Sequence, residues 1–74
     1  MKAYKIYFKD KDDEEKFYVK AVTFGGEPFV QIIAAFFEED IGIFEKDKAE
    51  KYVEMLNEQN KKTNIQFGLE ETEI

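Results

Sequence analysis

The sequence predicts an α+β fold, in which a small antiparallel sheet of three to five strands carries one amphipathic helix, in the order β-β-β-(β)-α-β. A segment near the N-terminus alternates with a period of two, which is typical of a strand, and a second segment rich in aromatic and β-branched residues follows it. A later segment repeats its apolar residues with the period of a helix. The 74 residues suffice for one hydrophobic core, so we expect a single domain over residues 1–74.

The first two strands are expected at residues 2–9 and 16–24, joined by a loop that is too polar to be buried. The second strand carries large apolar residues on both faces, which is unusual for a strand with one solvated face. Strict alternation assigns these residues to two faces, Phe17, Val19 and Ala21 on one and Tyr18, Val22 and Phe24 on the other.

A turn is expected at Gly25-Gly26-Glu27-Pro28, because paired glycines accept positive φ angles and proline cannot donate to a sheet ladder. The next nine residues, 29–37, are almost wholly apolar, which favours a buried strand. Pro28 at a first helical turn would also fit a short buried helix, so both alternatives stay open. A short edge strand is expected at residues 41–44.

The helix is expected at residues 48–59, where apolar residues follow i, i+3, i+4, i+7 spacing. Asp47 is the expected N-cap, and Glu50 three residues later completes a capping box. Asn60 is expected to close the helix in the left-handed region. A last strand is expected at residues 64–71.

The start of this helix resembles that of a group of small uncharacterised proteins. The segment Phe44-Glu45-Lys46-Asp47-Lys48-Ala49-Glu50-Lys51-Tyr52, followed by Leu56-Asn57, resembles a helix start found in small proteins of low-GC Gram-positive bacteria and their phages. In these proteins a strand ending in Phe leads into a capped helix. The resemblance implies a β-meander-plus-helix fold and supplies no activity.

The composition removes most catalytic side chains, because the chain has no Cys, His, Trp, Arg or Ser. We therefore expect no enzyme activity, no metal, no cofactor and no disulfide. The net charge of −6 disfavours binding to duplex nucleic acid, whose phosphates need cationic partners. No segment has the apolar length of a signal peptide or of a membrane span, so a cytoplasmic protein without membrane association is expected.

Two acidic segments are candidate chemical sites. Asp10-x-Asp12-x-Glu14 resembles the start of a calcium-binding loop, but Glu15 stands where that loop needs Gly, and Ala21 where it needs a bidentate carboxylate. The carboxylates of residues 38–40 could serve as acid and base only in a pocket that perturbs a pKa, which no neighbouring residue type indicates. Solvated loops are expected at both places.

The predicted sheet has more apolar surface than one helix can cover, which indicates an interaction surface. One helix can cover only one face of a small sheet, whereas the second and third strands offer apolar groups on both faces. A second copy of the chain or another protein is therefore expected to cover the other face, unless residues 29–37 form a second helix that does so. The predicted contact residues on this apolar sheet face are Tyr18, Val22, Phe24, Val30, Ile32 and Phe36.

The helix also predicts an acidic surface, because carboxylates recur on it at i, i+4 and i+8. Such a ridge would resemble a row of phosphates and fit the basic cleft of a nucleic-acid-binding protein. The alternative is a solvated helix face on which Lys46 pairs with Glu50 and Lys51 with Asp47. The residues of this acidic ridge are Asp47, Glu50, Glu54 and Glu58.

Together these patterns predict a noncatalytic protein-interaction domain that self-associates. The resemblance extends this to the hypothesis of a phage or mobile-element accessory protein that binds a host factor. Two alternatives remain open: an acidic inhibitor or nucleic-acid mimic, and a small carboxylate-based binding or enzyme module.

Overall fold

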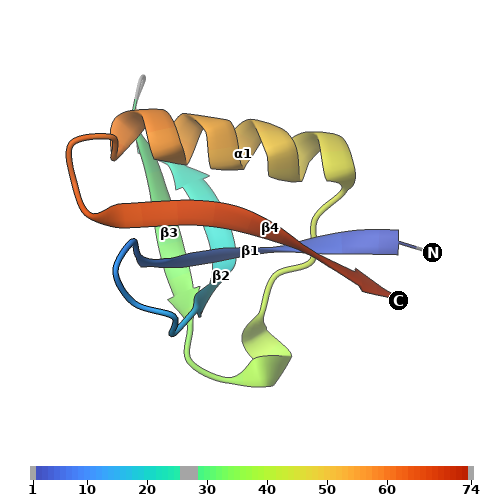
Figure 1. Cartoon of the computed structure of the whole chain (residues 1–74). Helices are drawn as coiled ribbons and strands as arrows, with labels where there is room; N and C mark the ends of the chain where they lie inside the picture. Colours follow the sequence, from blue (N-terminus) through green and yellow to red (C-terminus); the bar gives the residue numbers. More distant parts are fainter. Residues whose placement is uncertain (1, 26–28, 74) are drawn as a thin grey trace.

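The computed structural model describes residues 2–25 and 29–73, and in them an antiparallel four-stranded sheet carries a helix on one face (Figure 1). The strands are ordered β3-β2-β1-β4 across the sheet, so β3 and β4 form its edges. This confirms the predicted α+β class. The elements are β1 (Lys2–Asp10), β2 (Phe17–Phe24), β3 (Val30–Ala35), the short 3-10 helix η1 (Glu38–Asp40), α1 (Lys46–Gln59) and β4 (Ile65–Glu73).

The core lies between α1 and the sheet. Ala49 and Leu56 on the apolar stripe of the helix are buried there, at 0% and 1% exposure. Burial of large aliphatic side chains between two layers is the main stabilising contribution in a domain of this size. The buried core residues are Ile6, Val19, Val30, Ala49, Leu56 and Phe67.

The apolar segment after the predicted turn is a strand. β3 pairs with β2 along its length, from Val30 opposite Phe24 to Ala35 opposite Tyr18. The alternative of a second helix at residues 29–37 is therefore excluded. Residues 26–28 of the predicted turn lie outside the described residues.

A β-bulge in β2 changes which side chains face the helix. The pairing with β3 shifts between Val19 and Ala21, so Lys20 is an extra residue in the ladder. After the bulge the alternation restarts, and Val22 joins Val19 on the helix side. The prediction that Val22 and Phe24 share a face with Tyr18 is wrong for this reason.

The first two strands diverge, and a loop segment lies between them. β1 and β2 pair only at Tyr7 with Tyr18 and at Phe8 with Phe17. Beyond these pairs the Gly42 N–H donates to the Val19 carbonyl at 2.9 Å. The expected edge strand at residues 41–44 is wrong, because this segment enters the gap between two strands and forms one isolated bridge.

That bridge joins Phe44 to β1. Tyr4 and Phe44 exchange backbone hydrogen bonds of 3.0 and 2.8 Å. Two paired N–H and carbonyl groups are too few to define a strand, but they fix the chain just before it enters α1.

Both ends of α1 differ from the expected caps. The helix begins at Lys46, with Glu45 in the N-cap position and no side-chain cap hydrogen bond. Asp47 lies inside the first turn, where its charge still favours the helix dipole. At the other end Asn60 has φ −105°, outside the left-handed region. Its side-chain amide instead donates to the Leu56 carbonyl at 2.8 Å.

Gly42 occupies a position with no room for a side chain. A Cβ atom there would collide with the Lys20 carbonyl oxygen and lie 3.0 Å from the Phe44 ring. We expect Gly42→Ala to lower the free energy of unfolding by about 1–3 kcal/mol, because the bulged backbone of β2 must move. Urea denaturation measures the change.

Gly25→Ala is the matched control, because a Cβ atom at that position would meet only the flexible end of the Gln31 side chain, at 3.3 Å. Its unfolding free energy should stay close to that of the wild type. An equal loss of unfolding free energy in the two variants would contradict the inference that position 42 has no room for a side chain.

Candidate functional site

Large apolar side chains remain on the surface of the folded chain. Phe36 is 88% exposed and Phe37 is 65% exposed, both directly after β3. Phe29, just before β3, is also largely exposed, and Ile33 lies half exposed within the strand. This surface, which we call the β3 border, consists of Phe29, Ile33, Phe36 and Phe37.

The predicted apolar sheet face is divided by the structure. Val30 is buried in the core, and Val22 and Ile32 pack against the core from the helix side. The bulge in β2 and the covering helix account for these positions. These three side chains are therefore not available as one surface.

The other three predicted contact residues lie apart from each other. Phe24 is half exposed and its ring lies 5.8 Å from that of Tyr52 on α1. Tyr18 lies on the face without the helix, and Phe36 follows the end of β3. Of the six predicted contact residues, Phe36 alone also belongs to the β3 border.

Sequence reasoning missed Phe29, Ile33 and Phe37. All three belong to the apolar run that predicted a buried strand. Their exposure follows from the edge position of β3, and strand order is not encoded in the local pattern of a single segment.

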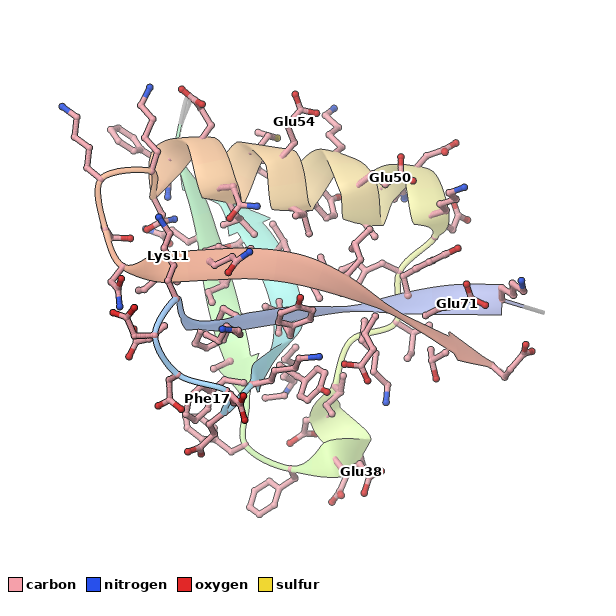
Figure 2. All side chains as sticks on the ribbon, in the orientation of Figure 1. Lys11, Phe17, Glu38, Glu50, Glu54 and Glu71 are labelled. Atoms are coloured by element: carbon pink, nitrogen blue, oxygen red, sulfur yellow. The ribbon has the colours of Figure 1, made fainter. Side chains whose placement is uncertain are left out.

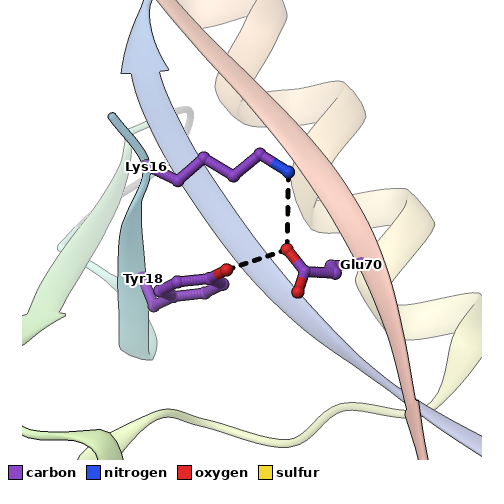
Figure 3. A network of polar contacts seen from close by, with 3 residues as sticks. All are labelled: Lys16, Tyr18 and Glu70. Atoms are coloured by element: carbon purple, nitrogen blue, oxygen red, sulfur yellow. Dashed lines mark hydrogen bonds and ion pairs between the residues drawn. The ribbon is translucent and has the colours of Figure 1, made fainter. Parts of the chain in front are cut away.

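The face without the helix carries a polar network at its centre (Figure 3). The Tyr18 hydroxyl donates to Glu70 Oε2 at 2.8 Å, and Lys16 Nζ lies 3.5 Å from the same oxygen. Lys16 also lies over the Tyr7 ring, 4.4 Å from its centroid. Gly68 makes room for that ring, because a Cβ atom there would collide with it. The network covers the β1 and β4 half of this face with the chain's own side chains.

The network shifts the pKa of one of its ionisable groups. The hydrogen bond to Glu70 raises the pKa of Tyr18 above its ordinary value of 10.0, and burial and the negative charge of Glu70 add to the rise. Ionisation of the phenol would place two negative charges against each other. The neutral phenol is therefore favoured in the fold.

Helix α1 also binds both edges of the sheet through side-chain amides. Gln59 accepts a hydrogen bond from the Val30 N–H at 2.9 Å and donates to the Val30 carbonyl at 2.8 Å. Asn57 does the same for Phe67 on β4, at 2.8 and 3.0 Å. Each amide takes the place of one residue of a neighbouring strand.

A shallow groove lies beside the β3 border. It has a volume of about 530 Å³ between Phe29 and the outer side of α1. Met55 contributes apolar surface, while carboxylates stand at the rim. The lining residues are Phe29, Lys51, Glu54, Met55, Glu58 and Gln59.

The acidic ridge is fully on the surface. All four of its residues are exposed, and Glu50 and Glu54 extend from the outer side of α1 (Figure 2). Glu58 forms an ion pair of 2.8 Å with Lys61. Among the described residues, no ion pair joins Lys46 to Glu50 or Lys51 to Asp47, so the expected relief by these lysines is not formed.

In the acidic loop between β1 and β2, side chains form hydrogen bonds with other residues of the chain. Asp13 Oδ1 accepts a hydrogen bond from the Glu15 N–H at 3.1 Å, and Asp12 accepts one from Asn64 at 3.3 Å. Within residues 2–25 and 29–73 no three carboxylates gather closely enough to hold a metal ion. In the same residues, the helices are too short or too polar to cross a bilayer.

Comparison with known proteins gives no match to a protein family, to a curated protein or to a solved structure.

The shift of Tyr18 gives a pH-dependent contribution to stability. Because its pKa is raised in the fold, the contribution is complete below about pH 10 and is lost as the pH rises through the raised value. We expect Glu70→Gln to lower the pKa of Tyr18 toward 10.0. NMR titration of the Tyr18 ring measures the pKa.

Glu71→Gln is the matched control, because Glu71 is the neighbouring carboxylate and pairs with Lys2 at 3.3 Å instead. The Tyr18 titration should be unchanged in that variant. An unchanged titration in Glu70→Gln as well would contradict the hydrogen bond as the main cause.

Proposed function

We propose that this chain is a noncatalytic protein-interaction domain that associates with itself. The observation that carries the proposal is the β3 border, where large apolar side chains stay in water although the helix face of the sheet is filled. Burial of these exposed side chains in a contact would be favourable, at roughly 25 cal/mol per Å² of apolar surface.

The polar network on the helix-free face indicates that a partner would contact only part of that face. Tyr18, Glu70 and Lys16 already satisfy one another there. The most exposed large apolar side chains, Phe29, Phe36 and Phe37, lie at the two ends of the edge strand β3. A partner needs to cover the β3 border rather than the whole second face.

Sedimentation across a concentration series tests the proposal. We expect the average mass of the wild type to rise with concentration. Phe36→Asp should weaken the association about a thousandfold, because each pair of chains loses two rings and the loss of each ring at an interface costs about 2 kcal/mol. Its fold should be unaffected, since Phe36 is 88% exposed.

Gln66→Asp is the control, because it adds the same charge at an exposed position on β4, the opposite edge. It should associate like the wild type. A wild-type mass that stays that of a monomer at every concentration would overturn the proposal.

A second candidate function is the acidic mimic of nucleic acid. The observation that favours it is that Glu50 and Glu54 are exposed and form no ion pair with described residues. Unpaired carboxylates one helical turn apart keep their full charge for a cationic partner.

A competition assay tests the mimic. The chain should displace duplex DNA from basic DNA-binding proteins at low salt, and less so at high salt. Glu50→Lys with Glu54→Lys should abolish the displacement. Glu38→Lys with Glu39→Lys makes the same charge change in η1 and should leave it intact. Equal loss in both double variants would indicate nonspecific charge attraction and contradict the ridge.

A further inference from the structure

The outer edge of β3 offers backbone groups without partners. Gln59 binds both the N–H and the carbonyl of Val30, so these groups point away from β2. Backbone direction alternates along an antiparallel strand, so the N–H and carbonyl of Ile32 and Ala34 also point outward. Outside the sheet no described residue hydrogen-bonds to them. Beyond Val30 the edge is open.

The opposite edge is protected in a way that β3 is not. β4 carries Glu71 and Glu73 in its outer half, and Asn57 covers Phe67. Charged residues on an edge strand discourage pairing with another strand. β3 has no charged residue, and neither do its flanks from Phe29 to Phe37.

The charge pattern indicates where two copies of this chain could meet. Two copies of a chain with a net charge of −6 repel each other wherever their acidic surfaces meet. Residues 28–37 form the longest stretch of the sequence without a charged residue. This stretch is therefore where two identical acidic chains can approach with the least repulsion.

We propose that two copies of the chain pair antiparallel through the outer edges of β3, with Ile33 of each copy opposite Ile33 of the other. The proposal rests on the self-association proposed above and assigns its site. Ile32 of each copy then faces Ala34 of the other, and both outward-facing residues gain complete backbone hydrogen bonding.

Pairings shifted by one residue would give hydrogen-bond partners to fewer backbone groups of β3. Pairing about Ile32 would place Ala34 opposite Val30, whose backbone groups Gln59 already binds. Pairing about Ala34 would place Ile32 opposite Phe36, which lies beyond the end of the strand. The Gln59 amide thus determines the register as well as protecting the first residue of β3.

The same register covers the exposed rings. In this register Phe36 and Phe37, which follow β3, lie near the end of the partner's β3 at which Phe29 and Gln59 stand, beside the groove lined by Met55. Enclosing three phenylalanine rings per copy buries on the order of 1,000 Å² in total. With the paired backbone added, the contact reaches the range of about 1,200–2,000 Å² typical of stable interfaces.

Complementary charges at residue 33 test the twofold axis. Ile33 is 48% exposed on the helix-free face, so a charge there should leave the fold intact. We expect Ile33→Lys and Ile33→Glu each to sediment as monomers, because like charges meet across the axis. An equal mixture of the two variants should form a heterodimer at low salt.

Gln66→Lys and Gln66→Glu supply the control on the opposite edge. Each should associate like the wild type, and mixing them should change nothing. If the wild type associates but the Ile33 variants do so equally, or their mixture stays monomeric, β3 pairing is overturned while the proposed function stands. A wild type that is monomeric throughout overturns both, and leaves β3 to a strand from a different protein.

Amide hydrogen exchange gives a second readout that needs no variant. At a concentration where nine in ten chains are paired, the Ile32 and Ala34 amides should exchange about tenfold more slowly than in dilute solution, because exchange then proceeds from the unpaired tenth. The amides of Glu71 and Glu73 on β4 should not change. Association without slowing at Ile32 and Ala34 would place the contact elsewhere and overturn the pairing.

Discussion

The bulge at Lys20 is the constraint on which the arrangement of this small domain depends. One extra residue in β2 brings Val19 and Val22 to the same side of the sheet, beneath α1. It also accompanies the divergence of β2 from β1, so that Gly42 can bond to Val19 between them. Without the bulge, the apolar residues of β2 would be divided between the helix and water. With it, one helix can fill one face of the sheet.

The helix contributes more than its apolar stripe. At its C-terminal end, Asn57 and Gln59 bind the two edge strands, each through both its amide oxygen and its amide nitrogen. A side-chain amide has the donor and acceptor of a backbone peptide, so each completes one position of the ladder. Because a short helix can reach each edge only once, protection stops after one residue. On β4 acidic side chains follow, whereas on β3 nothing charged does.

The residues that were predictable from the sequence depend on local periodicity, and those that were not depend on long-range placement. Alternation in β1 and the helical spacing of Ala49 and Leu56 act within a few residues, so the fold class and core helix could be predicted. The bulge follows from the competition between strand alternation and the fit beneath α1, which no local pattern encodes. The exposure of Phe29 and Phe37 requires the strand order, so the predicted contact residues included buried Val30 and missed both rings.

Two surfaces of opposite character are compatible on this chain because they lie on different elements. Glu50 and Glu54 of the acidic ridge extend from the outer side of α1 (Figure 2), whereas the β3 border follows the edge strand of the sheet. In the proposed pair, repulsion between the acidic helices would disfavour orientations other than the one in which β3 faces β3. Glu54 and Glu58, which line the groove beside Phe29, would stand at the rim of that contact. The proposed pair would be closed, because Glu71 and Glu73 on the second edge discourage further pairing of the sheet.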